Sequence, residues 1–237
     1  KNQKKIREVE WDSVKSFIKK GSKFLDVGCG SGFSMNKASV ELGCTTFGID
    51  PSPGNYGVGR YNNNSITSLN ISKGISEKID FDSNTFDVVF CSHVLEHVND
   101  ENKSLSEMKR VLKKNGVLII GMPTAEMAWI NLYTELLFTT HQRIFNVIFK
   151  GLPFIKTGKT SLINTLIPAS HSDHRARTIF FDIKYYSVKN WKSIISKCFK
   201  IEKVILPAFY PYPQYIQLFK MKIRHKKSSS VFFICRK

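Results

Sequence analysis

Long apolar stretches are missing from this 237-residue sequence. No uninterrupted apolar run approaches the ~20 residues that a helix needs to cross a bilayer. A secretory leader, with its charged, apolar and small-residue regions, is also absent, although the chain starts at Lys1 and residues can precede it. We therefore expect a cytoplasmic protein that is soluble or attached to a membrane only at its surface.

Cysteine is sparse and scattered through the chain. The five cysteines are Cys29, Cys44, Cys91, Cys198 and Cys235. No two of them have the spacing of metal ligands, and several lie in apolar runs where a thiol acts as a small hydrophobic group. This pattern predicts a reduced intracellular protein and gives no reason to expect a metal.

Acidic residues are few, at 19 against 36 lysines and arginines, and the formal net charge is +17. Such an excess favours an anionic partner such as nucleic acid, anionic lipid or a phosphorylated substrate. The sequence is also rich in Lys, Asn and Ile, as AT-rich genomes encode, so the charge can equally be a solvated surface. No RNA-binding module or basic-aromatic strip is present, which makes nucleic acid the less favoured partner.

The apolar pattern alternates between strand-like and helix-like segments, which predicts an α/β fold with a mostly parallel sheet. Helices are predicted at residues 11–20, 35–42, 99–114 and 188–198. Strands are predicted at residues 23–27, 45–49, 66–71 (weak), 86–91, 117–121, 199–206 and 231–235. No helix separates the last two strands, so we expect them to form an antiparallel return. The length suits one domain covering residues 1–237.

Residues 124–181 interrupt the alternation with a long apolar and aromatic segment. We interpret it as a largely helical insertion after the fifth strand, beside the carboxyl edge of the sheet. It can be a lid that excludes water, a pocket for an apolar acceptor, or a membrane contact aided by Lys150, Lys156 and Lys159. An ordinary helical pair packed on the core is the fourth alternative.

A glycine cluster follows the first predicted strand, at Gly28, Gly30 and Gly32. Glycine lets the backbone approach a ligand closely, because it has no Cβ. The third glycine of a dinucleotide fingerprint is missing, since Phe33 stands in its place, and this disfavours a pyrophosphate site. Asp50 ends the second strand, where a carboxylate can accept hydrogen bonds from a ribose diol or simply begin a turn before Pro51.

Four segments, in the order LDVGCGSG, FGID, FDVVFCSHVLEHV and RVLKKNGVLIIGMP, resemble the core motifs of class I S-adenosylmethionine-dependent methyltransferases. The similarity is greatest to the branch of ubiquinone-biosynthesis and related small-molecule methyltransferases, and it covers roughly residues 24–123. It implies a Rossmann-like fold with a seven-stranded, mostly parallel sheet and one antiparallel strand. It also implies S-adenosyl-L-methionine as the cofactor and S-adenosyl-L-homocysteine as the product.

The resemblance assigns cofactor binding to the glycine loop, the end of the second strand and the end of the fourth. One departure is the lack of an acidic residue where the family contacts adenine, so the backbone near Ile75 or the Ser76 hydroxyl would take that role. The cofactor-binding residues expected are Asp26, Gly28, Cys29, Gly30, Gly32, Asp50, Pro51, Ile75, Ser76, Ser92 and His93.

Methyl transfer to a hydroxyl needs a base, and histidine is the usual choice. His171 and His174 are the candidates, because they follow the insertion and precede a segment that resembles the family's approach to its penultimate helix. A solvated polar loop is the alternative interpretation. His93 lies at the expected mouth of the site, whereas Glu96 and His97 belong to the family's LEH pattern and would brace the following helix.

The branch resemblance and the insertion favour a small or lipid-linked acceptor, methylated on a hydroxyl. A sugar intermediate of a glycan and a prenylated aromatic compound both fit. RNA methylation and a catalytically silent, cofactor-binding scaffold remain as alternatives.

Overall fold

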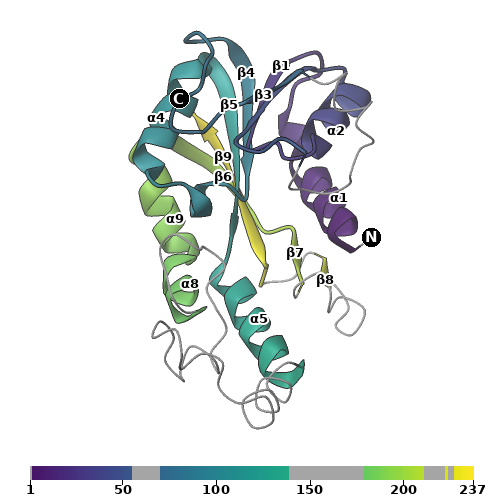
Figure 1. Ribbon diagram of the computed structural model, residues 1–237, viewed down its shortest axis with the longest axis vertical. Helices are drawn as coiled ribbons and strands as arrows, with labels where there is room; N and C mark the ends of the chain where they lie inside the picture. The colour runs from purple at the N-terminus through teal and green to yellow at the C-terminus, as the bar shows by residue number, and fades with distance from the viewer. Residues whose placement is uncertain (1, 55–69, 139–178, 211–221, 224–226) are drawn as a thin grey trace, which may run out of the picture.

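The computed structural model describes residues 2–54, 70–138, 179–210, 222–223 and 227–237 (Figure 1). Seven strands form one sheet in the order β3-β2-β1-β4-β5-β9-β6. Only β9 runs against its neighbours, since it pairs antiparallel with both β5 and β6. The strands are β1 (Lys23–Val27), β2 (Thr45–Asp50), β3 (Asn70–Lys73), β4 (Phe86–Ser92), β5 (Leu112–Pro123), β6 (Lys200–Ile205) and β9 (Ser230–Arg236). The Rossmann-like architecture predicted from the sequence is confirmed.

The central strands are buried on both faces, as their continuous apolar sequences require. Successive side chains point to opposite faces of a strand. Phe24 and Phe90 therefore pack in one apolar layer, and Leu25 and Val89 in the other. By the same alternation, Asp26 lies on the face of Phe24 and Phe90.

Helices cover both faces of the sheet (Figure 1). On the face of Phe24 lie α1 (Asn2–Val14) and α2 (Phe33–Leu42), which bury Trp11, Val14, Phe33 and Ala38 against it. The opposite face is covered by α4 (Glu101–Val111) and α9 (Val188–Ile195), with Leu105, Met108 and Trp191 in its core. Helix α1 therefore belongs to the same layer as the glycine loop that leads into α2.

Three predicted helix boundaries were wrong, and one of them is the end of the helix expected at residues 188–198, which ends at Ile195. The first helix was expected at residues 11–20, but it spans Asn2–Val14 because Ile6, Glu10, Trp11 and Val14 form its buried stripe. A 3-10 turn, η1 (Lys15–Phe17), follows it, and Ile18 is extended. The helix expected at residues 99–114 ends at Val111, because Leu112 already pairs with Phe86 in the sheet.

The predicted antiparallel return is confirmed by the β6–β9 pairing. A short second sheet pairs β7 (Ala208–Phe209) with β8 (Lys222–Ile223) between those two strands. The weak strand expected at residues 66–71 corresponds to β3, which starts at Asn70, and residues 66–69 lie outside the described ranges.

The described part of the predicted insertion is helical. Helix α5 (Ala125–Phe138) follows β5, and α8 (Ile179–Tyr185) precedes α9. Ala128 and Leu132 of α5 pack against Ile179 of α8, so the two helices form a pair. The remainder of the predicted insertion, residues 139–178, lies outside the described residues. No helix in the described ranges is both long enough and apolar enough to span a membrane.

Candidate functional site

The loop after β1 is held against β2 by its backbone. The N–H groups of Gly28 and Cys29 both donate to the Ile49 carbonyl, at 2.8 and 3.1 Å. Gly28 has φ +74°, and a Cβ at this position would lie 2.2 Å from Cγ2 of Val94. Only glycine fits here, because the segment after β4 runs directly against the loop.

Asp50 joins the ends of the two neighbouring strands. Its Oδ2 accepts a hydrogen bond from Gly30 N at 2.8 Å, and its Oδ1 accepts one from Ser52 N at 2.7 Å. A carboxylate has about four acceptor positions, so each oxygen can still accept one hydroxyl donor. The side chain is buried, and Pro51 beside it is exposed. The glycine loop and the carboxylate that the sequence placed at neighbouring strand ends thus form one unit.

Asp26 lies beneath this unit on the α1 face of the sheet. Burial, followed by the Asp50 carboxylate, raises the pKa of Asp26 to about 8, although the Arg7 guanidinium opposes this shift. Burial and the same two carboxylates raise the pKa of the Cys29 thiol well above its usual range. Asp26 is therefore largely protonated at pH 7, and Cys29 is an unreactive thiol.

Ile75 and Ser76 follow β3 and lie close to Asp50, whose carbonyl accepts a hydrogen bond from Gly74 N at 3.1 Å. The Ser76 hydroxyl is buried, 2.9 Å from the Ser104 hydroxyl and 3.0 Å from Glu77 Oε2. The Ile75 side chain is exposed. Ile75, rather than the already engaged Ser76 hydroxyl, therefore offers a free surface at this edge.

A charged cluster from α1 meets the end of β4, and it was not among the site residues predicted from the sequence. Arg7 pairs with Glu10 at 2.8 Å and approaches the Ser92 hydroxyl at 3.4 Å. Tyr210, far along the chain, donates its hydroxyl proton to Glu10 Oε1 at 2.7 Å. The one available signal was the acidic Glu10 within the stripe of Ile6, Trp11 and Val14, whose placement required the correct helix boundary.

His93 is the centre of this cluster. Its backbone φ is +57°, in the left-handed region that residues other than glycine rarely adopt. Its backbone N–H donates to the Gly121 carbonyl at 2.8 Å. Ring atom Nε2 lies 3.4 Å from Glu10 Oε1, and Nδ1 lies 3.5 Å from Glu96 Oε1. Burial and Arg7 act to lower the pKa of His93, but the two carboxylates outweigh them and the pKa is raised.

The two histidines expected to act as the base, His171 and His174, lie outside the described residues. The same holds for His141 and His225. Within the described ranges, no group of three or more His, Cys, Asp or Glu side chains has the arrangement of a metal site.

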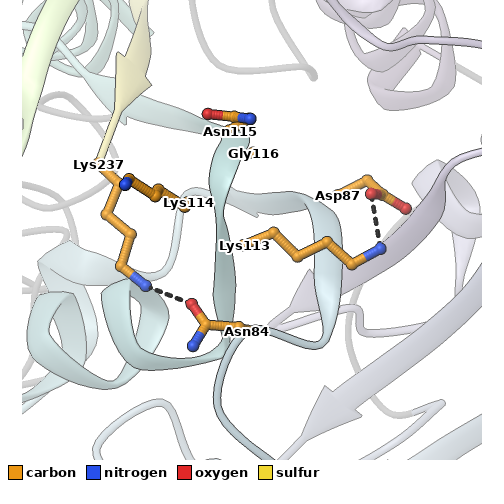
Figure 2. A pocket seen from close by; sticks show the side chains of 7 residues that line it. All are labelled: Asn84, Asp87, Lys113, Lys114, Asn115, Gly116 and Lys237. Carbon is orange, nitrogen blue, oxygen red and sulfur yellow. Dashed lines mark hydrogen bonds and ion pairs between the residues drawn. The ribbon is translucent and has the colours of Figure 1, made fainter.

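A separate hollow of about 690 Å³ opens at the opposite edge of the sheet, beside the amino ends of β4 and β5 (Figure 2). Lys113 is paired there with Asp87 at 2.8 Å, and Lys237 donates to Asn84 at 2.8 Å. Its residues are Asn84, Asp87, Lys113, Lys114, Asn115, Gly116 and Lys237. Since the glycine loop and His93 follow the carboxyl ends of β1 and β4, this hollow is not part of their site.

Comparison with known proteins agrees with this geometry. Residues 25–120 match the model of a family described as "Methyltransferase domain". The ubiquinone biosynthesis O-methyltransferase of Pelagibacter ubique is 32% identical over 124 residues, which cover 49% of this chain and 51% of that protein. The demethylmenaquinone methyltransferase of Staphylococcus aureus is 35% identical over 105 residues, which cover 43% of each. The chain thus spans about half the length or less of these curated relatives.

Solved structures show the same fold over nearly the whole chain. An S-adenosylmethionine-dependent methyltransferase from Mesorhizobium loti superposes with a TM-score of 0.57 at 15% identity, covering 97% of this chain and 98% of that one. A second, from Thermotoga maritima, gives a TM-score of 0.55 at 18% identity, covering 97% and 88%. The cofactor of this class is S-adenosyl-L-methionine, and S-adenosyl-L-homocysteine is its product. In its core motifs, strand order and domain match, the chain resembles the class I S-adenosylmethionine-dependent methyltransferases.

Proposed function

We propose that this chain binds S-adenosyl-L-methionine at the glycine loop and Asp50, and transfers its methyl group to a small acceptor. The observation that carries this proposal is the Asp50 carboxylate, which holds Gly30 N and Ser52 N and keeps acceptor positions for two ribose hydroxyls. The cofactor supplies a methyl group on a positively charged sulfur. The chain's own residues would bind the ribose, orient the donor and exclude water.

The remaining cofactor contacts in this proposal follow the edge of the sheet. Gly28, Cys29, Gly30 and Gly32 would surround the methionine end of the cofactor, above Asp26. Ile75 would pack on the adenine, and its backbone would read the adenine edge. The rest of the cofactor's surroundings would come from Pro51, Ser76, Ser92 and His93, not all of which would contact the cofactor directly.

The proposed acceptor is an aromatic, quinone-type precursor or another small molecule carrying a hydroxyl, either free or attached to a lipid. The names of the curated relatives support the first class, since one is a ubiquinone biosynthesis O-methyltransferase and another is a demethylmenaquinone methyltransferase. A lipid-linked acceptor is supported by α5, on which Trp129, Tyr133, Leu136 and Leu137 are about half exposed, at 48–55%. Apolar side chains gathered on one helix suit contact with a lipid tail or a membrane surface.

Calorimetric titration with S-adenosyl-L-methionine and S-adenosyl-L-homocysteine tests the cofactor site. Both should bind, and Asp50→Asn should weaken binding roughly tenfold to a hundredfold, because a hydrogen bond to a charged group contributes about 1.5–3 kcal/mol. Asp87→Asn, at the opposite edge of the sheet, is the matched control and should bind as the wild type does. Absence of binding to the wild type would end the proposal.

Methyl transfer is then measured with labelled cofactor and a panel of acceptors: a prenylated dihydroxybenzoate, a demethylated naphthoquinol, a lipid-linked sugar and bulk RNA. Transfer to one of the first three supports the proposal. Transfer to RNA, with retention that weakens steeply as salt rises, would replace it with RNA methylation, which the charge of +17 also permits. Binding without transfer to any acceptor would favour the scaffold interpretation.

A further inference from the structure

The segment that follows β4 brings His93 to the mouth of the proposed cofactor site. Strand register pairs Val27 with Cys91, so Ser92 and His93 lie beside the glycine loop. Val94 touches that loop so closely that it excludes a Cβ at Gly28. The left-handed backbone at His93 is strained for a residue other than glycine, and such strain persists where the surroundings impose it.

Glu96, in the 3-10 turn η2 (Leu95–His97), is fully buried and lacks an ordinary hydrogen bond. No donor among the described residues satisfies either of its carboxylate oxygens. Two histidine ring nitrogens lie near it, His93 Nδ1 at 3.5 Å and His97 Nε2 at 4.0 Å from Glu96 Oε1. An isolated buried carboxylate is costly, so Glu96 demands a proton on Nδ1 of His93. With the proton on Nδ1 held in this way, Nε2, which faces Glu10 Oε1 at 3.4 Å, is the ring nitrogen that loses and regains the second proton.

Glu10, on the other side of the ring, is satisfied without His93. Arg7 and Tyr210 donate to its two oxygens at 2.8 and 2.7 Å, which are normal lengths for charge-assisted hydrogen bonds. The contact from Nε2 to Glu10 is longer, at 3.4 Å. Nε2 can therefore exchange its contact with Glu10 for one with an incoming hydroxyl, and the Glu10 carboxylate stays paired with Arg7 and Tyr210.

We propose that His93 is the proton acceptor for the hydroxyl of the methyl acceptor, and that Glu96 and Glu10 are its positioning residues. This inference rests on the proposed function. The hydroxyl oxygen forms a bond to the methyl carbon while the methyl–sulfur bond breaks and leaves its electron pair on sulfur. The hydroxyl proton goes to Nε2, and the resulting imidazolium lies between two carboxylates that stabilise it.

This arrangement sets the direction of the pH dependence. The groups facing the ring are Arg7 and Glu10 from α1, with Tyr210 behind Glu10, and Glu96 from η2, with His97 behind Glu96. The carboxylates raise the pKa of His93 above its usual value near 6.5. The base is therefore protonated at low pH, and the rate should rise as the pH passes upward through this raised pKa.

Nuclear magnetic resonance measures this titration without any turnover. In ¹⁵N-labelled protein saturated with S-adenosyl-L-homocysteine, the ring signals that vanish in His93→Gln belong to His93. Their midpoint should lie above about 6.5 and should fall in Glu10→Gln and in Glu96→Gln. Glu202→Gln removes an exposed carboxylate paired with Arg236 and should leave the midpoint unchanged. If the midpoint of the His93 titration is the same in Glu10→Gln and in Glu96→Gln as in the wild type, the proposal is overturned.

Kinetics with the acceptor found in the panel supply the second test. His93→Gln should lower kcat by about 10²–10⁴-fold, the usual contribution of a general base, with unchanged cofactor affinity. Glu10→Gln should move the acidic limb of the kcat profile to lower pH, and Glu202→Gln should not move it. A His93→Gln variant that binds cofactor and retains the wild-type kcat would refute the role of His93 alone. A wild-type protein that does not bind the cofactor would refute the proposed function instead.

Should Glu96→Gln fail to fold, Tyr210→Phe is the substitute variant. It removes one donor to Glu10 and leaves every charge in place, so Glu10 should draw closer to His93 and the midpoint should rise. A falling midpoint would contradict the assigned geometry.

Discussion

Gly28→Ala tests the close approach of the glycine loop and the segment after β4. Two costs add at this position. The left-handed backbone, φ +74°, costs roughly 1–2 kcal/mol once a Cβ is present. The Cβ would also lie 2.2 Å from the Val94 side chain, and forcing extra volume into a packed site costs about 1–3 kcal/mol. We expect a total loss of about 2–5 kcal/mol in the free energy of unfolding, together with loss of cofactor binding.

Gly21→Ala is the matched control, because Gly21 has nearly the same φ, +72°, and nothing within 4 Å of its would-be Cβ. It should show only the backbone cost of roughly 1–2 kcal/mol. Urea unfolding followed by circular dichroism gives both values, provided that the slope with denaturant is unchanged. The difference between the two variants then isolates the steric contribution of Val94.

A double-mutant cycle completes the test. In a Val94→Ala background the Gly28→Ala substitution should cost only a little more than Gly21→Ala, because a contact of 3.2 Å with the Cβ at position 94 remains. This corresponds to a coupling of about 1–3 kcal/mol between positions 28 and 94. Equal destabilisation by Gly28→Ala and Gly21→Ala, with no coupling to Val94, would show that the two segments do not touch as described.

Three further predictions concern charge and the exposed helix. Because Asp26 holds its proton up to a pKa of about 8, wild-type stability should fall as pH rises from about 4 to 8, and Asp26→Asn should flatten this slope in thermal melts; an unchanged slope would contradict the raised pKa. Glu10 has a lowered pKa, so the stability it contributes is present above about 4.5 and lost as pH falls below that value, and Glu10→Gln should make acid unfolding less steep. Replacing Trp129 and Tyr133 by serine should reduce sedimentation with anionic vesicles without changing the affinity for S-adenosyl-L-homocysteine, and equal sedimentation would argue against a membrane contact through α5.

The cofactor half of the site could be predicted from the sequence because its parts are local. A buried strand, a glycine cluster and a helix follow one another within residues 23–42, and a second strand delivers Asp50 to the neighbouring end. Parallel strands bring their carboxyl ends to one edge, so the meeting of the loop and Asp50 follows from the order of elements alone. Strands β1, β2 and β4 were located within a residue for the same reason, whereas β5, predicted at residues 117–121, spans Leu112–Pro123.

The base half of the site could not be predicted, because it depends on contacts between distant segments. Glu10 reaches His93 and Tyr210, which lie 83 and 200 positions further along the chain. Starting the first helix at residue 11 excluded Arg7 and Glu10 from consideration. The left-handed backbone at His93 could not be predicted either, because the residue is not a glycine. The position of the ring between its two carboxylate neighbours was therefore missed as well.

Arg7 connects the two halves electrostatically. Its guanidinium pairs with Glu10 beside His93, and its charge also lowers the pKa of Asp26 beneath the glycine loop. A positive group of the cofactor placed above Asp26 would favour ionised Asp26, and ionised Asp26 would in turn strengthen the hold on Arg7. A firmly held Arg7 keeps Glu10 charged and in place next to the ring. Because the Arg7 charge itself lowers the pKa of His93, Arg7→Gln should raise the midpoint of the His93 titration, and an unchanged midpoint would contradict this coupling.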